Sequence, residues 1–338
     1  MQKLKTSCLS RRSFVKNLGA VSMMPLLTGF STTNYTLSSN DHTKVLLDTD
    51  IGTDPDDGAC LAYVLLQKRC DLLGITTVGK DAPIRAQLAE MIANSLDRTD
   101  VPIAAGAKEP LFSNIYWWDH HLKQKYLLDK YQPQNTYKYG QAVSLMKENI
   151  DQYPNEITLL CVGPLTNAAA LWASYPGTFK LLKDVVVMGG YFHSKTEYEC
   201  NTMLDPTAAA AIYQRSGIPI RVAGLEQTRP LSVPQSMVKQ WFSKPKYQPL
   251  REFCGKGNRL GMHDPLAAAI IFNENLCEYK RGHVNIRLKQ YDVVKDKEAE
   301  EVTGYTTFTP DDNGPHKIVT NTRKEKFHAH LAAIWEQV

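Results

Sequence analysis

The chain has 338 residues, of which 43% are hydrophobic and 22% charged, and this composition suits one large folded domain. Its formal net charge is +4. Five Lys and Arg lie within the first 16 positions, so the remainder is near neutral and gives no case for nucleic-acid binding. The seven cysteines show neither a CxxC pair nor zinc-site spacing, and Cys60, Cys161 and Cys277 lie in apolar runs that predict buried thiols.

The N-terminal segment has the pattern of a twin-arginine export signal. The run SRRSFVK at 10–16 precedes a modest apolar stretch, 18–30, which is too short and too interrupted by Gly and Pro to span a bilayer. We therefore predict a signal at 1–30, a polar linker at 31–43 and the folded domain at 44–338, in an exported, periplasmic protein without a stable membrane span. The alternative is a basic disordered tail.

Five aspartates follow the first predicted strand. The run Val45–Leu47 is too short for a helix and predicts a buried strand, and a helical apolar pattern follows at 59–66. Carboxylates this close repel one another unless they bind a proton or a cation, and ligand sets made only of oxygen favour Ca²⁺ or Mg²⁺. Open α/β sheets bind ligands at the carboxyl ends of their strands. The aspartates are Asp48, Asp50, Asp54, Asp56 and Asp57.

Three other local structures compete to explain the cluster. Asp54 as a helix cap, with Pro55 at the first helical position, explains the helix start but not Asp48 and Asp50. An EF-hand started at Thr53 lacks an acid at its first position and fails. A phosphatase of the haloacid dehalogenase type also begins with a strand and D-x-D, but the chain offers no convincing later lysine or second acidic strand end.

Strand and helix patterns alternate along the rest of the chain. Strands are predicted at 71–78, 102–106, 157–162, 185–188 and 219–222, and helices at 84–96, 139–151, 165–175 and 206–215. Helical segments continue to about residue 277, followed by a β-hairpin of 283–290 with 317–320 and a final helix from Arg323. The alternation predicts a single large α/β domain, built on a mostly parallel open sheet with helices on both faces.

The irregular segment 107–138 is rich in aromatic residues. An irregular stretch of this length in a compact domain is more often functional than idle. Trp117 and Trp118 are interpreted as packing residues rather than base-stacking residues, and His120 and His121 as surface residues.

Taken in order, several motifs make the chain similar to the inosine–uridine preferring nucleoside hydrolase family, from Lys44 to the C-terminus. They are DTDIGTDPDD (48–57), ITTVG (75–79), VPIAAG (101–106), VGPLTN (162–167), VVVMGG (185–190), ECNTMLDP (199–206) and MHDPLA (262–267). The resemblance implies a salvage enzyme that hydrolyses small-molecule ribonucleosides with one bound Ca²⁺ per chain and no organic cofactor.

The resemblance also implies a ligand set for the metal. Asp50, Asp57 and Asp264 would be carboxylate ligands of Ca²⁺, and the carbonyl of Val162 would add a backbone ligand. Asp48 would support these ligands without binding the metal itself. Asp50 would also be the base that takes a proton from the metal-bound water.

The substrate contacts follow from the same resemblance. Asp56 would accept a hydrogen bond from a ribose hydroxyl, Glu199 and Asn201 would hold the 5′ side of the sugar, and Met188 would pack beneath the ribose. His263 would protonate the leaving base. Taken alone, Glu199-x-Asn201 is typical of a solvated turn. The stretch that begins at His263 is, taken alone, typical of a helix cap with Pro265 at the first helical position.

The chain departs from the family pattern at three places. Five residues rather than three separate Asp50 from Asp56, so Asp54 competes with Asp56 for the ribose role. Lys80-Asp81 stands where the family has asparagine. The loop between Met188 and Glu199 is short and offers no matching asparagine, so sugar recognition is expected to differ.

The predicted function is calcium-dependent hydrolysis of the N-glycosidic bond of ribonucleosides, with metal-activated water and inversion at C1′. One alternative is a calcium-containing protein that binds nucleosides or sugars without turnover. The other is a hydrolase of a different ribosyl or glycosyl compound. The sequence leaves base preference and oligomeric state open, a homo-oligomer included.

Overall fold

The protein is described here by a computed structural model. It describes residues 42–111, 122–193, 198–255, 257–288, 291–292, 297–298 and 304–336. The predicted export signal, Trp117, Trp118, His120 and His121 lie outside these ranges. The first strand begins at Thr43, one residue before the predicted start of the domain. Each helix in the described part of the chain is too short or too polar to span a bilayer.

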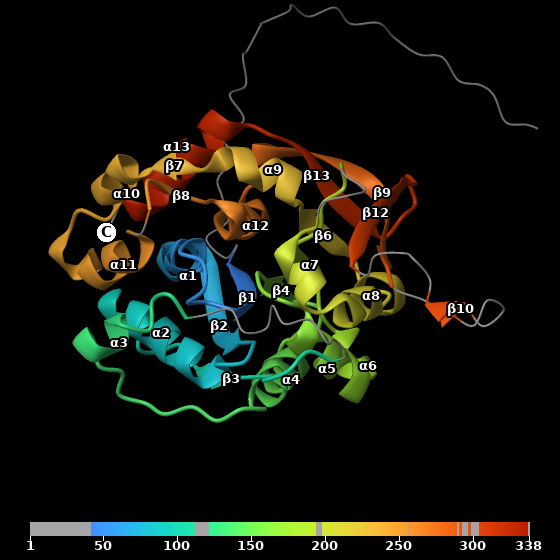
Figure 1. The fold of residues 1–338 in the computed structure, drawn as a ribbon, viewed down its shortest axis with the longest axis horizontal. Coiled ribbons are helices and arrows are strands. Elements are labelled where there is room, and N and C mark those ends of the chain that lie inside the picture. Colours follow the sequence, from blue (N-terminus) through green and yellow to red (C-terminus); the bar gives the residue numbers. More distant parts are fainter. Residues whose placement is uncertain are drawn as a thin grey trace, which may run out of the picture. The chain divides into compact units, whose positions relative to one another are not determined.

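Nine strands of the described chain form one open sheet, in the order β12-β9-β13-β6-β5-β4-β1-β2-β3 (Figure 1). Neighbours from β13 to β3 pair in parallel, whereas β9 is antiparallel to β12 and β13, so the predicted mostly parallel sheet is confirmed. The strands are β1 (Thr43–Thr49), β2 (Cys70–Thr77), β3 (Ile103–Ala105), β4 (Ile157–Cys161), β5 (Asp184–Met188), β6 (Ile220–Ala223), β9 (Cys277–Arg287), β12 (Tyr305–Pro310) and β13 (His316–Thr322).

Helices cover both faces of this sheet because its central strands are apolar on both sides. In β1, Val45 and Leu47 face one core and Leu46 faces the other. Full burial of such a side chain contributes about 1.5–3 kcal/mol. The first core includes α1 (Asp56–Leu66), α2 (Ala82–Ser95), α10 (Gln235–Trp241), α11 (Gln248–Cys254), α12 (His263–Phe272) and α13 (Lys324–Trp335). The second includes α4 (Ala142–Gln152), α5 (Thr166–Ser174), α6 (Pro176–Phe179) and α8 (Pro206–Arg215).

The antiparallel end of the sheet differs from the prediction. Residues 277–282 of β9 pair with β13, but residues 282–287 pair with β12, which was not predicted. The predicted pairing of 283–290 with 317–320 is therefore wrong in register, because one long strand takes a different partner along each edge. Two small sheets were also not predicted: β7 (Val233–Pro234) with β8 (Arg259–Leu260), and β10 (Tyr291–Asp292) with β11 (Lys297–Glu298).

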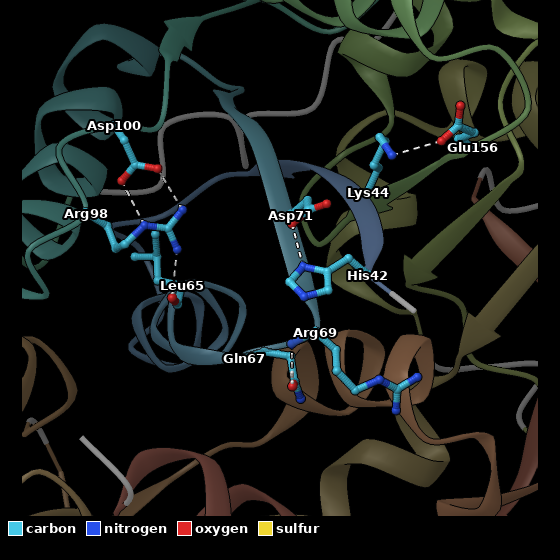
Figure 2. Close-up of polar contacts among 9 residues, drawn as sticks. All are labelled: His42, Lys44, Leu65, Gln67, Arg69, Asp71, Arg98, Asp100 and Glu156. Carbon is cyan, nitrogen blue, oxygen red and sulfur yellow. Dashed lines mark hydrogen bonds and ion pairs between the residues drawn. The ribbon is translucent and has the colours of Figure 1, made fainter. Parts of the chain in front are cut away.

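Charged groups beside the amino ends of β1 and β2 pair with one another (Figure 2). The His42 ring lies 2.7 Å from an Asp71 carboxylate oxygen, and Lys44 Nζ lies 2.8 Å from Glu156 Oε2. These contacts are exposed and contribute little to stability. They show that charged groups at this edge of the sheet pair with close neighbours.

Candidate functional site

A cavity of about 180 Å³ lies at the carboxyl edge of the central strands. It receives residues from the ends of β1, β4 and β5 and from the first turns of α1, α7 (Cys200–Leu204) and α12. Every residue predicted to bind metal, bind substrate or react contributes to its lining. The lining residues are Asp50, Thr53, Asp54, Asp56, Asp57, Lys123, Val162, Met188, Glu199, Cys200, Asn201, Leu204, Leu225, His263 and Asp264.

Three buried aspartates of the cavity lie at the N-termini of two helices. Asp56 and Asp57 lie in the first turn of α1, and Asp264 lies in the first turn of α12. The two helices pack against each other (Figure 1). Residues more than 200 positions apart therefore meet where the two helices begin. Carboxylates are favoured at helix N-termini by the positive end of the helix dipole.

Burial and mutual repulsion raise the pKa values of these aspartates. Desolvation raises the pKa of Asp50 to about 6, although the nearby guanidinium of Arg85 opposes the shift. Desolvation, and then the charges of neighbouring aspartates, raise the pKa values of Asp57 and Asp264 well above the ordinary range. Such a cluster is stabilised by taking up protons or a cation.

The donor chemistry of the cavity fits a hard cation. Asp50, Asp57 and Asp264 supply only oxygen atoms, which is the ligand type that Ca²⁺ and Mg²⁺ prefer. Within the described residues, however, no three His, Cys, Asp or Glu side chains already converge as a metal site. The Val162 carbonyl accepts a hydrogen bond from Asn201 Nδ2 at 2.9 Å. The individual ligand set therefore stays a prediction.

Asp54 does not cap α1, so the predicted cap with Pro55 at the first helical position is wrong. The residue that caps α1 is Pro55, which makes no side-chain capping bond, while the Asp54 carboxylate is 63% exposed and lies 3.1 Å from Lys123 Nζ. Helix α12 begins at His263, without a cap from its own segment. Instead Asp56 Oδ2 accepts hydrogen bonds from the backbone N–H groups of His263 (3.1 Å) and Asp264 (3.4 Å). Asp56 thus joins the two helix starts.

Asp48 lies behind the cavity rather than in its lining. Its Oδ1 accepts hydrogen bonds from Thr76 Oγ1 (2.7 Å) and Asn167 Nδ2 (2.8 Å), whereas its buried Oδ2 has no hydrogen-bond partner among the residues that the structure describes. Burial raises the pKa of Asp48 to about 7. Asn167 had no predicted role, although it ends the motif VGPLTN. A Cβ at Gly106 would overlap the Asn167 side chain, so this packing requires glycine.

Glu199 is buried and fixed rather than part of a solvated turn. Its carboxylate accepts from the N–H groups of Asn201 (2.7 Å), Thr202 (2.8 Å) and Gly190 (3.0 Å), which caps α7 and ties it to the end of β5. The Asn201 amide donates to the Met188 carbonyl at 3.2 Å. These bonds hold Glu199, Asn201 and Met188 together at the wall of the cavity.

A threonine that the sequence did not indicate holds His263. His263 Nδ1 lies 2.8 Å from Thr228 Oγ1, and the Thr228 hydroxyl donates to the Leu225 carbonyl at 3.3 Å. A hydroxyl has one hydrogen, so Thr228 accepts from Nδ1–H and leaves Nε2 for the cavity. A Cβ at Gly261 would lie 2.9 Å from His263 Cδ2, so the ring needs the space that this glycine leaves.

Comparison with known proteins decides the family. The profile of the inosine-uridine preferring nucleoside hydrolases matches residues 45–329. The chain belongs to this family. The nucleoside hydrolases are enzymes that act on N-glycosyl bonds and depend on a metal, although the match does not identify the ion.

Relatives among characterised proteins carry different substrate names. Uridine nucleosidase 1 of Arabidopsis thaliana is 29% identical over 286 residues, which is 76% of this chain and 83% of that protein. The pyrimidine-specific ribonucleoside hydrolase RihA of Escherichia coli O1:K1 / APEC is 32% identical over 192 residues, 54% of this chain and 60% of that protein. The RihA match therefore leaves more than a third of that relative uncovered.

Solved structures show the same fold. A plant nucleoside hydrolase, PpNRh1, superposes with a TM-score of 0.69 at 22% identity, covering 88% of this chain and 99% of that one. The purine-preferring ribonucleoside hydrolase from Gardnerella vaginalis gives a TM-score of 0.70 at 20% identity, covering 88% and 100%. At this identity the likeness supports the architecture alone.

Proposed function

We propose that this nucleoside hydrolase uses calcium to hydrolyse the N-glycosidic bond of ribonucleosides and release nucleobase and ribose. One observation carries the proposal: a single cavity gathers the buried carboxylates of α1 and α12 with the Glu199–Asn201 pair and the His263 ring. Neither a helix cap nor a solvated turn explains that combination.

Asp50 is the proposed base. It lies at the end of β1 and lines the cavity, where its carboxylate takes a proton from the attacking water. A divalent cation held by Asp50, Asp57, Asp264 and the Val162 carbonyl supplies, when bound, a Lewis acid that lowers the pKa of water and neutralises the carboxylates. Attack from this one face inverts the configuration at C1′.

The proposed sugar contacts come from residues in the cavity lining. Asp56 accepts from a ribose hydroxyl, since it is buried in the cavity wall, whereas the more exposed Asp54 pairs with Lys123. Glu199 and Asn201 bind the 5′ side, and Met188 packs beneath the ring. The carboxylates around the ribose stabilise the positive charge that develops as the glycosidic bond breaks.

The leaving base is protonated by His263. Thr228 engages Nδ1, so the proton is delivered from Nε2 of the imidazolium ring. The ring returns to its neutral tautomer after each transfer because the Nδ1 hydrogen bond is kept.

A panel assay tests the proposal. The purified protein is incubated with uridine, cytidine, inosine, guanosine and adenosine, and with non-nucleoside ribosides, and reducing sugar is measured. Release of ribose from at least one nucleoside is expected. Binding without release would favour the sugar- or nucleoside-binding alternative, and release from the non-nucleoside ribosides alone would favour the other hydrolase.

We also propose export through the twin-arginine signal at 1–30 into the periplasm. Fractionation of cells that express the full chain should place the activity in the periplasm, and replacement of Arg11 and Arg12 by lysine should retain it in the cytoplasm. Equal distribution of the two forms would overturn this assignment. Light scattering of the exported protein reports whether it forms a homo-oligomer.

A further inference from the structure

Arg85, in the first half of α2, lies against the backbone of the aspartate segment. The residue is only 3% exposed. Its Nη1 donates to the carbonyl oxygens of Asp50 and Ile51, the latter at 3.1 Å, and to Thr53 Oγ1 at 3.0 Å. One guanidinium nitrogen therefore contacts the turn that links Asp50 to α1.

The charge of Arg85 makes its burial unusual. Among the described residues no carboxylate forms an ion pair with Arg85, and its buried Nε has no hydrogen-bond partner. Charged side chains are rarely buried without such a partner.

The turn itself explains why a donor is needed there. Five residues separate Asp50 from Asp56 and link β1 to α1. Because this turn is neither strand nor helix, its backbone carbonyl groups need hydrogen-bond donors from elsewhere. Gly52 has φ +112°, and a Cβ at this position would lie 2.6 Å from Leu88 Cδ1 and 2.8 Å from Leu122 Cδ2. The turn is thus packed tightly against α2, and Arg85 from that helix satisfies its inward carbonyls.

We infer that Arg85 is a positioning residue that holds the turn from Asp50 to Thr53 and so places the Asp50 carboxylate for cation binding and for the attacking water. The role given to Asp50 rests on the proposed function. The contacts of Arg85 with the turn are observed in the structure and do not depend on that function. Residues that orient a metal ligand without touching the metal typically change metal affinity or activity by about 10–100-fold.

Three variants test this role. Arg85→Met removes the charge and the donors at similar length, and Arg85→Lys keeps the charge. Arg98→Met is the matched control, because Arg98 Nη1 also donates to a backbone carbonyl, that of Leu65 at 2.9 Å, but near the last turn of α1 (Figure 2). Calcium affinity is measured by titration calorimetry, together with kcat, KM and the thermal midpoint.

Arg85→Met should weaken calcium affinity by about 10–100-fold. It should lower kcat at saturating calcium by a similar factor with little change in KM, since Asp56, Glu199 and Asn201 are untouched. Arg85→Lys should recover part of both losses. Arg98→Met should lower the thermal midpoint without changing calcium affinity or kcat.

Wild-type calcium affinity and kcat in a folded Arg85→Met protein would overturn the inference. Should that variant fail to fold, Arg85→Lys decides: reduced calcium affinity at an unchanged thermal midpoint supports the role, and wild-type affinity with wild-type kcat refutes it. If the wild type binds calcium through this site but hydrolyses no nucleoside, the proposed function fails while the calcium arm still tests Arg85.

Discussion

His263 Nδ1 and Thr228 Oγ1 lie 2.8 Å apart, between the start of α12 and the end of the short helix α9 (Leu225–Thr228). The Thr228 hydroxyl also donates to the Leu225 carbonyl. This order of donors keeps hydrogen on Nδ1 in both protonation states of the ring. The pair therefore offers Nε2 alone for exchange of a proton with the substrate.

His263→Ala should slow hydrolysis of inosine by about 10²–10⁴-fold, which is the usual contribution of general acid catalysis. Hydrolysis of p-nitrophenyl riboside should slow far less, because its phenolate leaves without protonation. Both rates are measured at saturating calcium. Equal losses for the two substrates would indicate that His263 positions Asp264 at the start of α12 and is not the acid.

Thr228→Val should reproduce part of the His263 effect, with a loss on inosine smaller than the roughly 10²–10⁴-fold expected for His263→Ala. The substitution keeps the size of the side chain but removes the oxygen that accepts from Nδ1–H. Thr228→Ser keeps that oxygen and should remain near wild type. Two variants of equal rate would show that the hydroxyl does not orient the ring.

Calcium should be required for turnover. Dialysis against a strong chelator should abolish activity, and calcium should restore it better than zinc, because the cavity presents carboxylate oxygens and no thiolate or imidazole cluster among the described residues. The metal content of the stripped protein is verified by mass spectrometry. Full activity with no metal present would refute the requirement.

Asp56→Asn should impair ribose binding more than Asp54→Asn does. Asp56 is buried and also accepts from the N–H groups at the start of α12, whereas the exposed Asp54 pairs with Lys123. We expect Asp56→Asn to raise KM by about 10-fold or more, equivalent to about 1.4 kcal/mol. A larger rise in KM for Asp54→Asn would give the ribose role to Asp54.

Stability should fall in mild acid because of His316. Its Nδ1 accepts from the Val284 N–H at 2.8 Å, and burial together with the neighbouring His283 lowers its pKa to about 4. The unfolded chain takes up this proton near the ordinary histidine pKa of about 6.5. The contribution of neutral His316 to the free energy of unfolding is therefore fully present above about pH 6.5. It is lost as the pH falls toward the folded-state pKa of about 4.

Urea unfolding at about pH 7.5 and about pH 5 measures this effect. The wild type should lose about 1–2 kcal/mol more than His316→Asn between these pH values, since asparagine keeps an acceptor but does not titrate. Parallel losses in the two proteins would place the acid sensitivity elsewhere.

The mostly parallel sheet and the position of the aspartates were predictable from sequence. Apolar runs such as Val45–Leu47, and the alternation of such runs with helical patterns, depend on short stretches of chain. A strand followed at once by Asp48 and Asp50 places carboxylates at the carboxyl edge of a sheet. This position follows from the local sequence and does not depend on residues far along the chain. The cavity could therefore be anticipated, and so could its acidic character.

Contacts between distant segments were decided only by the tertiary structure. Asp56 caps a helix that begins more than 200 residues later, Arg85 meets the carbonyls near Asp50 from another helix, and Thr228 meets His263 from the end of α9. The sequence around each of these side chains does not predict its hydrogen-bond partner. Their partners follow from how α1, α2 and α12 pack on the sheet, because that packing brings together hydrogen-bonding groups that local sequence leaves unpaired.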